Sequence, residues 1–304
     1  MTGADQAREG PTSMRPAPRI RWLRARALPA FWVFLGLLAA GGWRIASIAR
    51  ASFAAYPRAA TAAVVLFALY AVPVLLLLRA VGYCGRGSAL TLATALGWGG
   101  LVATSAAIAG NAAVQDLLAK LASPETAATW GSAISGAGVE EIIKVLGVAA
   151  IALFVRPRFT GVVDGFVYGA LVGLGFQVVE NIVFALNAVA VAGEGDRVSP
   201  VVLTLLLRGF PGGLWSHTLF TGLAGAGVAY AMTRRDRPMA VRLLAGSAGV
   251  VAAAAIHFLW NSPPLVDGFG FGLPGALAAL LVRAVPVALA CLLLLRAAER
   301  RIAC

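Results

Sequence analysis

Charged residues are scarce in this chain of 304 residues, because only 12% are Asp, Glu, Lys or Arg while 60% are hydrophobic. Soluble domains are on average about one quarter charged and about half apolar. The shortage of charge therefore excludes an ordinary soluble protein and favours one that lies in a lipid bilayer. Apolar runs long enough to cross a bilayer recur from about residue 28 to about residue 296, with no separate soluble domain between them.

Cysteine is also rare, and the familiar hydrolase motifs are missing. The three cysteines, Cys84, Cys291 and Cys304, form no CxxC pair, which argues against a structural disulfide or a zinc–thiolate site. The sequence has no GxSxG, no HExxH, no Cys beside a His and no glycine-rich phosphate loop. Serine-hydrolase and soluble zinc-protease chemistry therefore lack support.

Acidic residues are few, so the formal net charge is +12, and it is carried almost entirely by arginine. A basic chain can bind nucleic acid, but these arginines lie between apolar segments or near the termini. That placement is typical of a membrane protein whose cytosolic loops hold positive charge against anionic lipid. We therefore expect the lipid bilayer as a partner and no nucleic acid. Nothing in the sequence specifies an oligomeric state.

The apolar runs predict an all-α fold, a polytopic bundle of transmembrane helices. A helix needs roughly 20 apolar residues to cross about 30 Å of hydrocarbon. This length predicts about eight spans, near residues 29–48, 60–80, 89–110, 132–155, 162–190, 211–232, 240–260 and 273–296. The apolar segment 198–210 is too short to cross separately, and we expect it at the outer interface.

The distribution of arginine predicts that both termini are cytosolic. Only the first hairpin opposes this orientation, through Arg44, Arg50 and Arg58. The polar, Pro- and Arg-rich N-terminus has no apolar core, so we expect no cleavable signal peptide and a multi-pass protein of the plasma membrane. The predicted regions are a disordered basic tail (1–27), N-terminal transmembrane helices (28–131), a catalytic transmembrane core (132–262), and a last helix with a short basic tail (263–304).

Ionisable residues at four positions in the predicted spans stand out, because an ionisable residue at mid-helix costs at least about 2.5–3.5 kcal/mol on insertion scales. They are Glu140 with Glu141, Glu180, His217 and His257, which include both histidines of the chain. At 1.5 Å per residue, all of them lie roughly 5–15 Å below the outer face. Residues that were only structural would not need a common depth, so the pattern predicts one polar site.

Further polar residues lie close to these in the sequence. Lys144 is one helical turn after Glu140 and Glu141, so its ammonium group can pair with either carboxylate. His257 and Asn261 are four residues apart and share a helix face. Asn181 adjoins Glu180, and Arg208 precedes the PGG break at 211–213, where it can supply a cation near the outer mouth.

Three functions fit this set of residues. Glutamate and histidine around a polar pocket suit hydrolysis, with a glutamate deprotonating water and His and Asn stabilising an oxyanion. A proton- or ion-coupled transporter also uses Glu, His and Lys relays, but it should offer steps on both sides of the membrane. A non-catalytic adaptor would use Glu140, Glu141 and Lys144 only as an ion-pair lock between helices.

Four segments resemble the successive motifs of the PrsW family of intramembrane proteases, which is distantly related to the CAAX-processing and bacteriocin-immunity proteases. The segments are VEEIIKV (139–145), DGFVYGALVGLGFQVVENIVF (164–184), LLLRGFPGGLWSHTLFTG (205–222) and IHFLWN (256–261). The EExxK spacing at 140–144 favours this family over the CAAX type, which usually shows EExxxR. The resemblance implies an endopeptidase that cuts single-span, membrane-anchored proteins, typically anti-sigma factors.

The resemblance also assigns roles to particular residues. It implies that Glu140, Glu141, His217 and His257 are catalytic, and the supporting residues are Lys144, Glu180, Asn181, Asn261 and Arg208. If Zn²⁺ is bound, the ligands expected are Glu141, Glu180, His217 and His257, since zinc accepts histidine nitrogen and carboxylate oxygen. Such enzymes have been described with and without a metal, and we favour a metal-free or metal-optional form in which Glu140 activates water.

Overall fold

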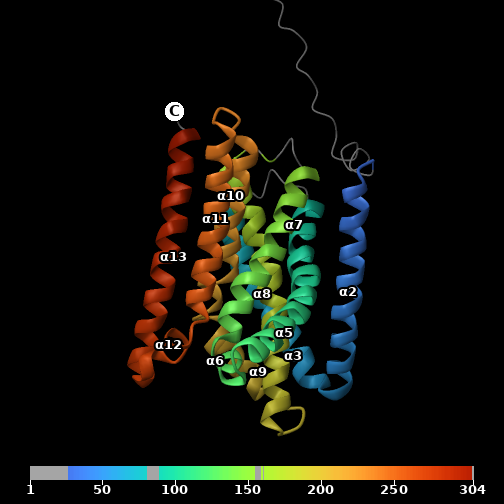
Figure 1. The fold of residues 1–304 in the computed structure, drawn as a ribbon. Helices are drawn as coiled ribbons and strands as arrows, with labels where there is room; N and C mark the ends of the chain where they lie inside the picture. Colours follow the sequence, from blue (N-terminus) through green and yellow to red (C-terminus); the bar gives the residue numbers. More distant parts are fainter. Residues whose placement is uncertain (1–26, 81–88, 155–158, 160, 303–304) are drawn as a thin grey trace, which may run out of the picture.

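The computed structural model describes residues 27–80, 89–154, 159 and 161–302, and every regular element in these ranges is a helix (Figure 1). The predicted all-α fold is therefore confirmed. The predicted tail 1–27 lies outside the described residues apart from residue 27, as do Arg86, Arg156 and Arg158 of the predicted cytosolic loops.

Ten α-helices are the main elements of the described ranges. They are α2 (Pro29–Ala55), α3 (Pro57–Ala80), α4 (Ala89–Gly97), α5 (Thr104–Leu121), α6 (Pro124–Ser135), α7 (Glu141–Phe154), α8 (Val162–Ala192), α10 (His217–Thr233), α11 (Met239–Trp260) and α13 (Gly272–Ile302). The shorter α-helices are α9 (Ser199–Thr204) and α12 (Pro263–Val266). Three π-helical turns, η1 (Trp98–Ala103), η2 (Gly136–Glu140) and η4 (Leu205–Gly209), and two 3-10 turns, η5 (Gly213–Trp215) and η6 (Gly268–Gly270), complete the described elements.

Six of the helical segments are long and apolar enough to cross a membrane. They are Pro29–Ala55, Pro57–Leu78, Ala89–Leu121, Val162–Ala192, Met239–Trp260 and Gly272–Arg296. Each overlaps one of the predicted spans, although Pro29–Ala55 and Ala89–Leu121 extend beyond the predicted ends at 48 and 110. The other two predicted spans correspond to the α6–η2–α7 segment, which carries several charged residues, and to α10, which has only 17 residues. The α10 helix begins at His217, six residues later than predicted, because the PGG break and η5 precede it.

Helix α8 lies in the middle of the bundle, with α2 and α13 at opposite edges of the view in Figure 1. Its glycines at every fourth position face α10. A Cβ atom added at Gly165, Gly169 or Gly173 would overlap the backbone of α10, whose nearest carbonyls belong to Gly225, Thr221 and His217. Small residues let two helices approach to backbone contact in a bilayer, so this glycine face fixes α10 against α8.

The described part of the chain begins and ends at the same end of the bundle, where α2 starts and α13 stops (Figure 1). The loop between α10 and α11 lies at this end as well. The residues predicted to form the polar site lie toward the opposite end, because Glu141 and His217 begin α7 and α10 and His257 lies in the last turn of α11.

Candidate active site

The two adjacent glutamates occupy a break in helix geometry. Glu140 is the last residue of the π-helical turn η2, and Glu141 is the first residue of α7. Both side chains are buried, with Glu140 3% and Glu141 0% exposed. A π-helical turn changes the direction in which successive side chains point and is frequent at functional sites. Here it lets two neighbouring carboxylates point into the same interior.

Lys144 provides the positive charge for both carboxylates. Its Nζ lies 3.2 Å from Glu140 Oε2 and 3.0 Å from Glu141 Oε1, and the lysine is fully buried. The ammonium group also lies 2.9 Å from His217 Nδ1 and 3.7 Å from the centre of the Phe176 ring. The three hydrogen bonds use the full donor capacity of the ammonium group, and the Phe176 ring adds a cation–π contact.

His217 is held between a cation and an anion. Lysine can only donate, so the His217 Nδ1 nitrogen accepts from Lys144. The other ring nitrogen, Nε2, lies 3.1 Å from Glu180 Oε2 and donates to that carboxylate. The two contacts together fix His217 as the neutral ring protonated at Nε2. Its backbone position is set by Gly173, where a Cβ atom would overlap the His217 carbonyl group.

His257 has the opposite arrangement. Its Nδ1 lies 3.0 Å from Glu141 Oε1, so this nitrogen donates to the carboxylate. Its Nε2 accepts from Asn261 Nδ2 at 3.1 Å, one helical turn further along the chain. The Glu141 carboxylate therefore fixes the protonation and orientation of His257, while Glu180 does the same for His217. The two imidazole rings meet edge to face, with centroids 4.9 Å apart.

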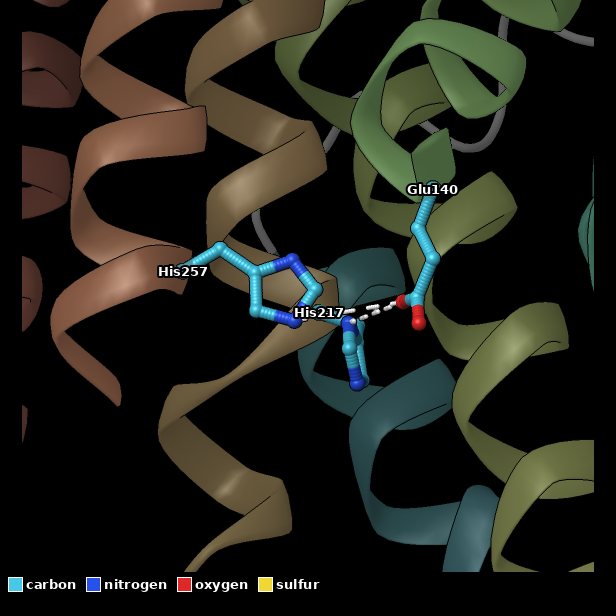
Figure 2. A group of neighbouring side chains, drawn as sticks. All are labelled: Glu140, His217 and His257. Carbon is cyan, nitrogen blue, oxygen red and sulfur yellow. Dashed lines mark ion pairs between the residues drawn. The ribbon is translucent and has the colours of Figure 1, made fainter. Parts of the chain in front are cut away.

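The nitrogens that do not donate to a carboxylate converge on Glu140 (Figure 2). His217 Nδ1 lies 4.0 Å and His257 Nε2 lies 3.9 Å from Glu140 Oε2. One ligand atom from each of Glu140, His217 and His257 lies within 4.8 Å of the other two, and all three residues are buried. Two nitrogens and one carboxylate oxygen are a donor set that Zn²⁺ accepts in catalytic sites, where a fourth position stays open for water.

The donor set therefore fits a divalent metal in its chemistry, and both histidines donate to a carboxylate from their other ring nitrogen, as metal-binding histidines usually do. Ligand atoms around tetrahedral zinc lie about 3.4 Å apart when each bond is about 2.1 Å. The two distances from Glu140 Oε2 to the histidine nitrogens, 4.0 and 3.9 Å, would shorten by about half an ångström, and a separation of 4.8 Å, the limit for the group, would shorten by about 1.4 Å. Lys144 would also have to release His217 Nδ1, because its ammonium group now lies against that nitrogen.

Arg208 extends the polar network outward. It belongs to the π-helical turn η4 and donates from Nη2 to Glu180 Oε2 at 2.6 Å and from Nε to Asn181 Oδ1 at 2.8 Å. Its guanidinium group stacks 3.8 Å above the Phe184 ring. A bonded chain thus runs from Arg208 through Glu180 to His217.

The structure brings all the predicted site residues into one connected network. The described side chains that could together hold a metal ion are Glu140, His217 and His257, whereas the ligands expected from the sequence were Glu141 and Glu180 with the two histidines. In the structure Glu141 accepts from His257 Nδ1 and Glu180 accepts from His217 Nε2, which we call the outer nitrogens. The carboxylate that faces the inner nitrogens, His217 Nδ1 and His257 Nε2, is Glu140.

Sequence reasoning missed three residues that contact the glutamates or Lys144. Asn111 on α5 donates from Nδ2 to Glu140 Oε1 at 2.9 Å, and Thr221 on α10 donates to Glu141 Oε2 at 3.4 Å. Phe176 lies under the Lys144 ammonium group. Asn111 had a usable signal, since it is an amide between the apolar stretches 106–110 and 112–114. Thr221 and Phe176 had none, because such residues are common in any membrane helix.

Comparison with known proteins gives one match. A family model described as PrsW family intramembrane metalloprotease matches residues 87–291, more than half of the chain. The matched range includes Glu140, Glu180, His217 and His257 as well as Asn111. No curated protein and no solved structure matches the chain.

Proposed function

Because the chain belongs to the PrsW family of intramembrane metalloproteases, we propose that Glu140, His217 and His257 form the centre at which it hydrolyses peptide bonds. The observation that carries the proposal is the convergence of these side chains, from three separate helical segments, on one buried point. Burial of two glutamates, a lysine and two histidines costs free energy in a bilayer, and catalysis is a function that requires such groups.

Glu140 is the residue proposed to take a proton from the attacking water. Its Oε2 faces both histidines, and Asn111 holds its other oxygen. If Oε2 held a metal ion, Oε1 would keep a lone pair beyond the one to which Asn111 donates. The carboxylate could therefore still accept the proton as the water attacks the peptide carbonyl and then return it to the leaving amine. Lys144 limits the cost of keeping this carboxylate charged in a buried place.

Glu141 and Glu180 are proposed to position the histidines. Each accepts from one ring nitrogen of a histidine, His257 Nδ1 or His217 Nε2, so that the other ring nitrogen, which lies about 4 Å from Glu140 Oε2, stays unprotonated. His217, His257 and Glu140 would hold the metal ion of the family. When bound there, the ion supplies Lewis-acid polarisation of a water or a carbonyl oxygen.

Asn261 is proposed to stabilise the negative charge that develops on the peptide oxygen. Its Nδ2 lies 3.1 Å from His257 Nε2 at the rim of the cluster, and the residue is partly exposed. An amide donor aimed at the developing oxyanion contributes a large part of catalysis in acyl transfer. Asn261 therefore marks the side from which the scissile peptide bond would approach.

The enzyme is a multi-pass membrane protein, and an intramembrane protease acts on membrane proteins. We propose single-span substrates of the anti-sigma-factor type and a location in the plasma membrane.

The α6–η2–α7 segment and α10 lie alongside the six apolar helices (Figure 1), which supports eight crossings with residues 132–262 as the main part of the catalytic core. Arg234, Arg235 and Arg237 lie in the loop at the end of the bundle where α2 starts and α13 stops, which supports a cytosolic assignment for that end.

The test is a cleavage assay with purified protein in liposomes. The substrates would be single-span reporters with a Leu/Ala-rich segment that contains a Gly-Ser stretch in its outer half. Wild type should cut at least one reporter, while Glu140→Gln should lower the rate by at least about 10³-fold, because the general base is removed. Glu125→Gln, at an exposed position in the first turn of α6, is the matched control and should cut at the wild-type rate.

Two outcomes would contradict the proposal. Failure of wild type to cut any reporter, in a preparation whose thermal unfolding shows it to be folded, would count against proteolysis. Cleavage by Glu140→Gln at the wild-type rate would exclude this residue as the base.

A further inference from the structure

A groove lies between α8 and the short segment formed by α9 and η4. Its volume is about 1020 Å³, at the upper end of the range of ligand pockets, which is about 300–1,000 Å³. Most of its lining is apolar, with Phe184 and Ala188 on α8 and Leu203 and Leu207 on the opposite side. The groove can therefore take several apolar side chains of a bound molecule.

The inner end of the groove meets the proposed active site. Arg208 lines the groove and donates to Glu180 Oε2, which lies 3.1 Å from His217 Nε2. Glu180, Phe184 and Ala188 follow one another at intervals of four residues, so they share one face of α8. The apolar lining thus continues along the same helix face into the polar network.

The length of the α9–η4 segment explains why the groove ends at Arg208. The segment covers 11 residues, Ser199–Gly209. At 1.5 Å per residue it is about 16 Å long, roughly half of the 30 Å hydrocarbon thickness. A helix of this length reaches only to mid-membrane depth, and its far end carries Arg208 against Glu180.

A polar atom that lacks a partner lies behind Arg208, outside the lining of the groove. Asn181 is 2% exposed, and its Oδ1 accepts from Arg208. Among the residues that the structure describes, its Nδ2 has no hydrogen-bond partner. Buried donors without a partner are rare, and this donor lies beside the guanidinium group that closes the groove.

We propose that this groove binds the membrane-spanning segment of the substrate and leads it to the active site, an inference that rests on the proposed protease function. An apolar segment that unwinds for cleavage exposes peptide carbonyls, which need donors inside the membrane. The guanidinium group of Arg208, which lines the groove, supplies such donors at the inner end, while the apolar walls accept the side chains. A lipid tail would fill the apolar part but has no group that matches these donors.

The test fills the groove and measures how substrate binding changes. Leu203→Trp and Leu207→Trp each place a large ring in the groove, and they should raise KM for the cleaved reporter by about tenfold while kcat stays unchanged, as expected when uniform binding is lost. The matched control is Leu244→Trp on α11, where the leucine is 72% exposed and lies outside the groove. It should leave both constants unchanged.

A second measurement uses a photo-crosslinking residue, p-benzoylphenylalanine, at position 203 or 244 of the Glu140→Gln protein, which should hold the reporter without cutting it. Crosslinking to the reporter from 203 and not from 244 supports the groove. Two results would overturn the proposed role of the groove and leave the protease function intact. The first is that wild type cuts the reporter and both tryptophan variants keep the wild-type KM. The second is that position 203 crosslinks to lipid alone. Failure of wild type to cut any reporter would overturn both.

Discussion

Replacement of Lys144 by methionine tests how the buried charges are balanced. Methionine keeps most of the side-chain volume but removes the ammonium group, whose Nζ lies 3.2 Å from Glu140 Oε2 and 3.0 Å from Glu141 Oε1. Two adjacent carboxylates, at most 3% exposed, would then lack a cation. Loss of one partner of a buried pair costs about 3–5 kcal/mol. At about 2 °C per kcal/mol this lowers the unfolding temperature by roughly 6–10 °C.

Zinc should reverse much of this loss, because an ion held by Glu140, His217 and His257 brings a positive charge to the same place. At about 100 times its Kd, a ligand adds about 2.7 kcal/mol of stability. The assay is thermal unfolding in detergent, with and without Zn²⁺. Lys120→Met, at an exposed position in the last turn of α5, should change stability by less than about 0.5 kcal/mol. A metal-free Lys144→Met protein that unfolds at the wild-type temperature would refute the reasoning.

Two further substitutions address the positioning of the histidines. Gly173→Ala should cost about 1–3 kcal/mol of stability and lower cleavage, because the added methyl group overlaps the His217 carbonyl; Gly161→Ala, where the space is open, should change the unfolding temperature less. Glu180→Gln should weaken zinc affinity by about 10–100-fold, measured by titration of reporter cleavage with Zn²⁺ in a chelating buffer. Equal zinc affinity in Glu180→Gln and wild type would show that the hydrogen bond between Glu180 and His217 does not help to hold the metal.

The fold was largely predictable, because hydrophobic runs determine where membrane helices lie. Six predicted spans overlap helices that meet the length and apolarity needed for crossing. The breaks were not predictable. The π-helical turn at 136–140 and the late start of α10 at His217 depend on packing against neighbouring helices, such as the contact of Gly173 with the His217 backbone. Local sequence patterns do not encode such contacts.

The convergence of the polar residues was predictable from their rarity and their common depth. Their pairing was not. Periodicity identified Lys144 as a partner of both glutamates on its own helix, and the structure shows those contacts. It gave no indication that Glu141 would bond to His257 and Glu180 to His217, because these pairs join different helices. For the same reason the sequence did not predict that Glu140 is the carboxylate that faces His217 Nδ1 and His257 Nε2.

The measurement that tests the central claim most directly is the rate of reporter cleavage by metal-stripped wild type before and after addition of Zn²⁺, together with the zinc bound per chain. The account predicts little cleavage without metal, recovery when about one ion binds per chain, and loss of both the ion and the activity in His257→Ala, since catalytic zinc needs three protein ligands. Full cleavage by the metal-free chain, or an undiminished rate in His257→Ala, would contradict a catalytic centre made of Glu140, His217 and His257.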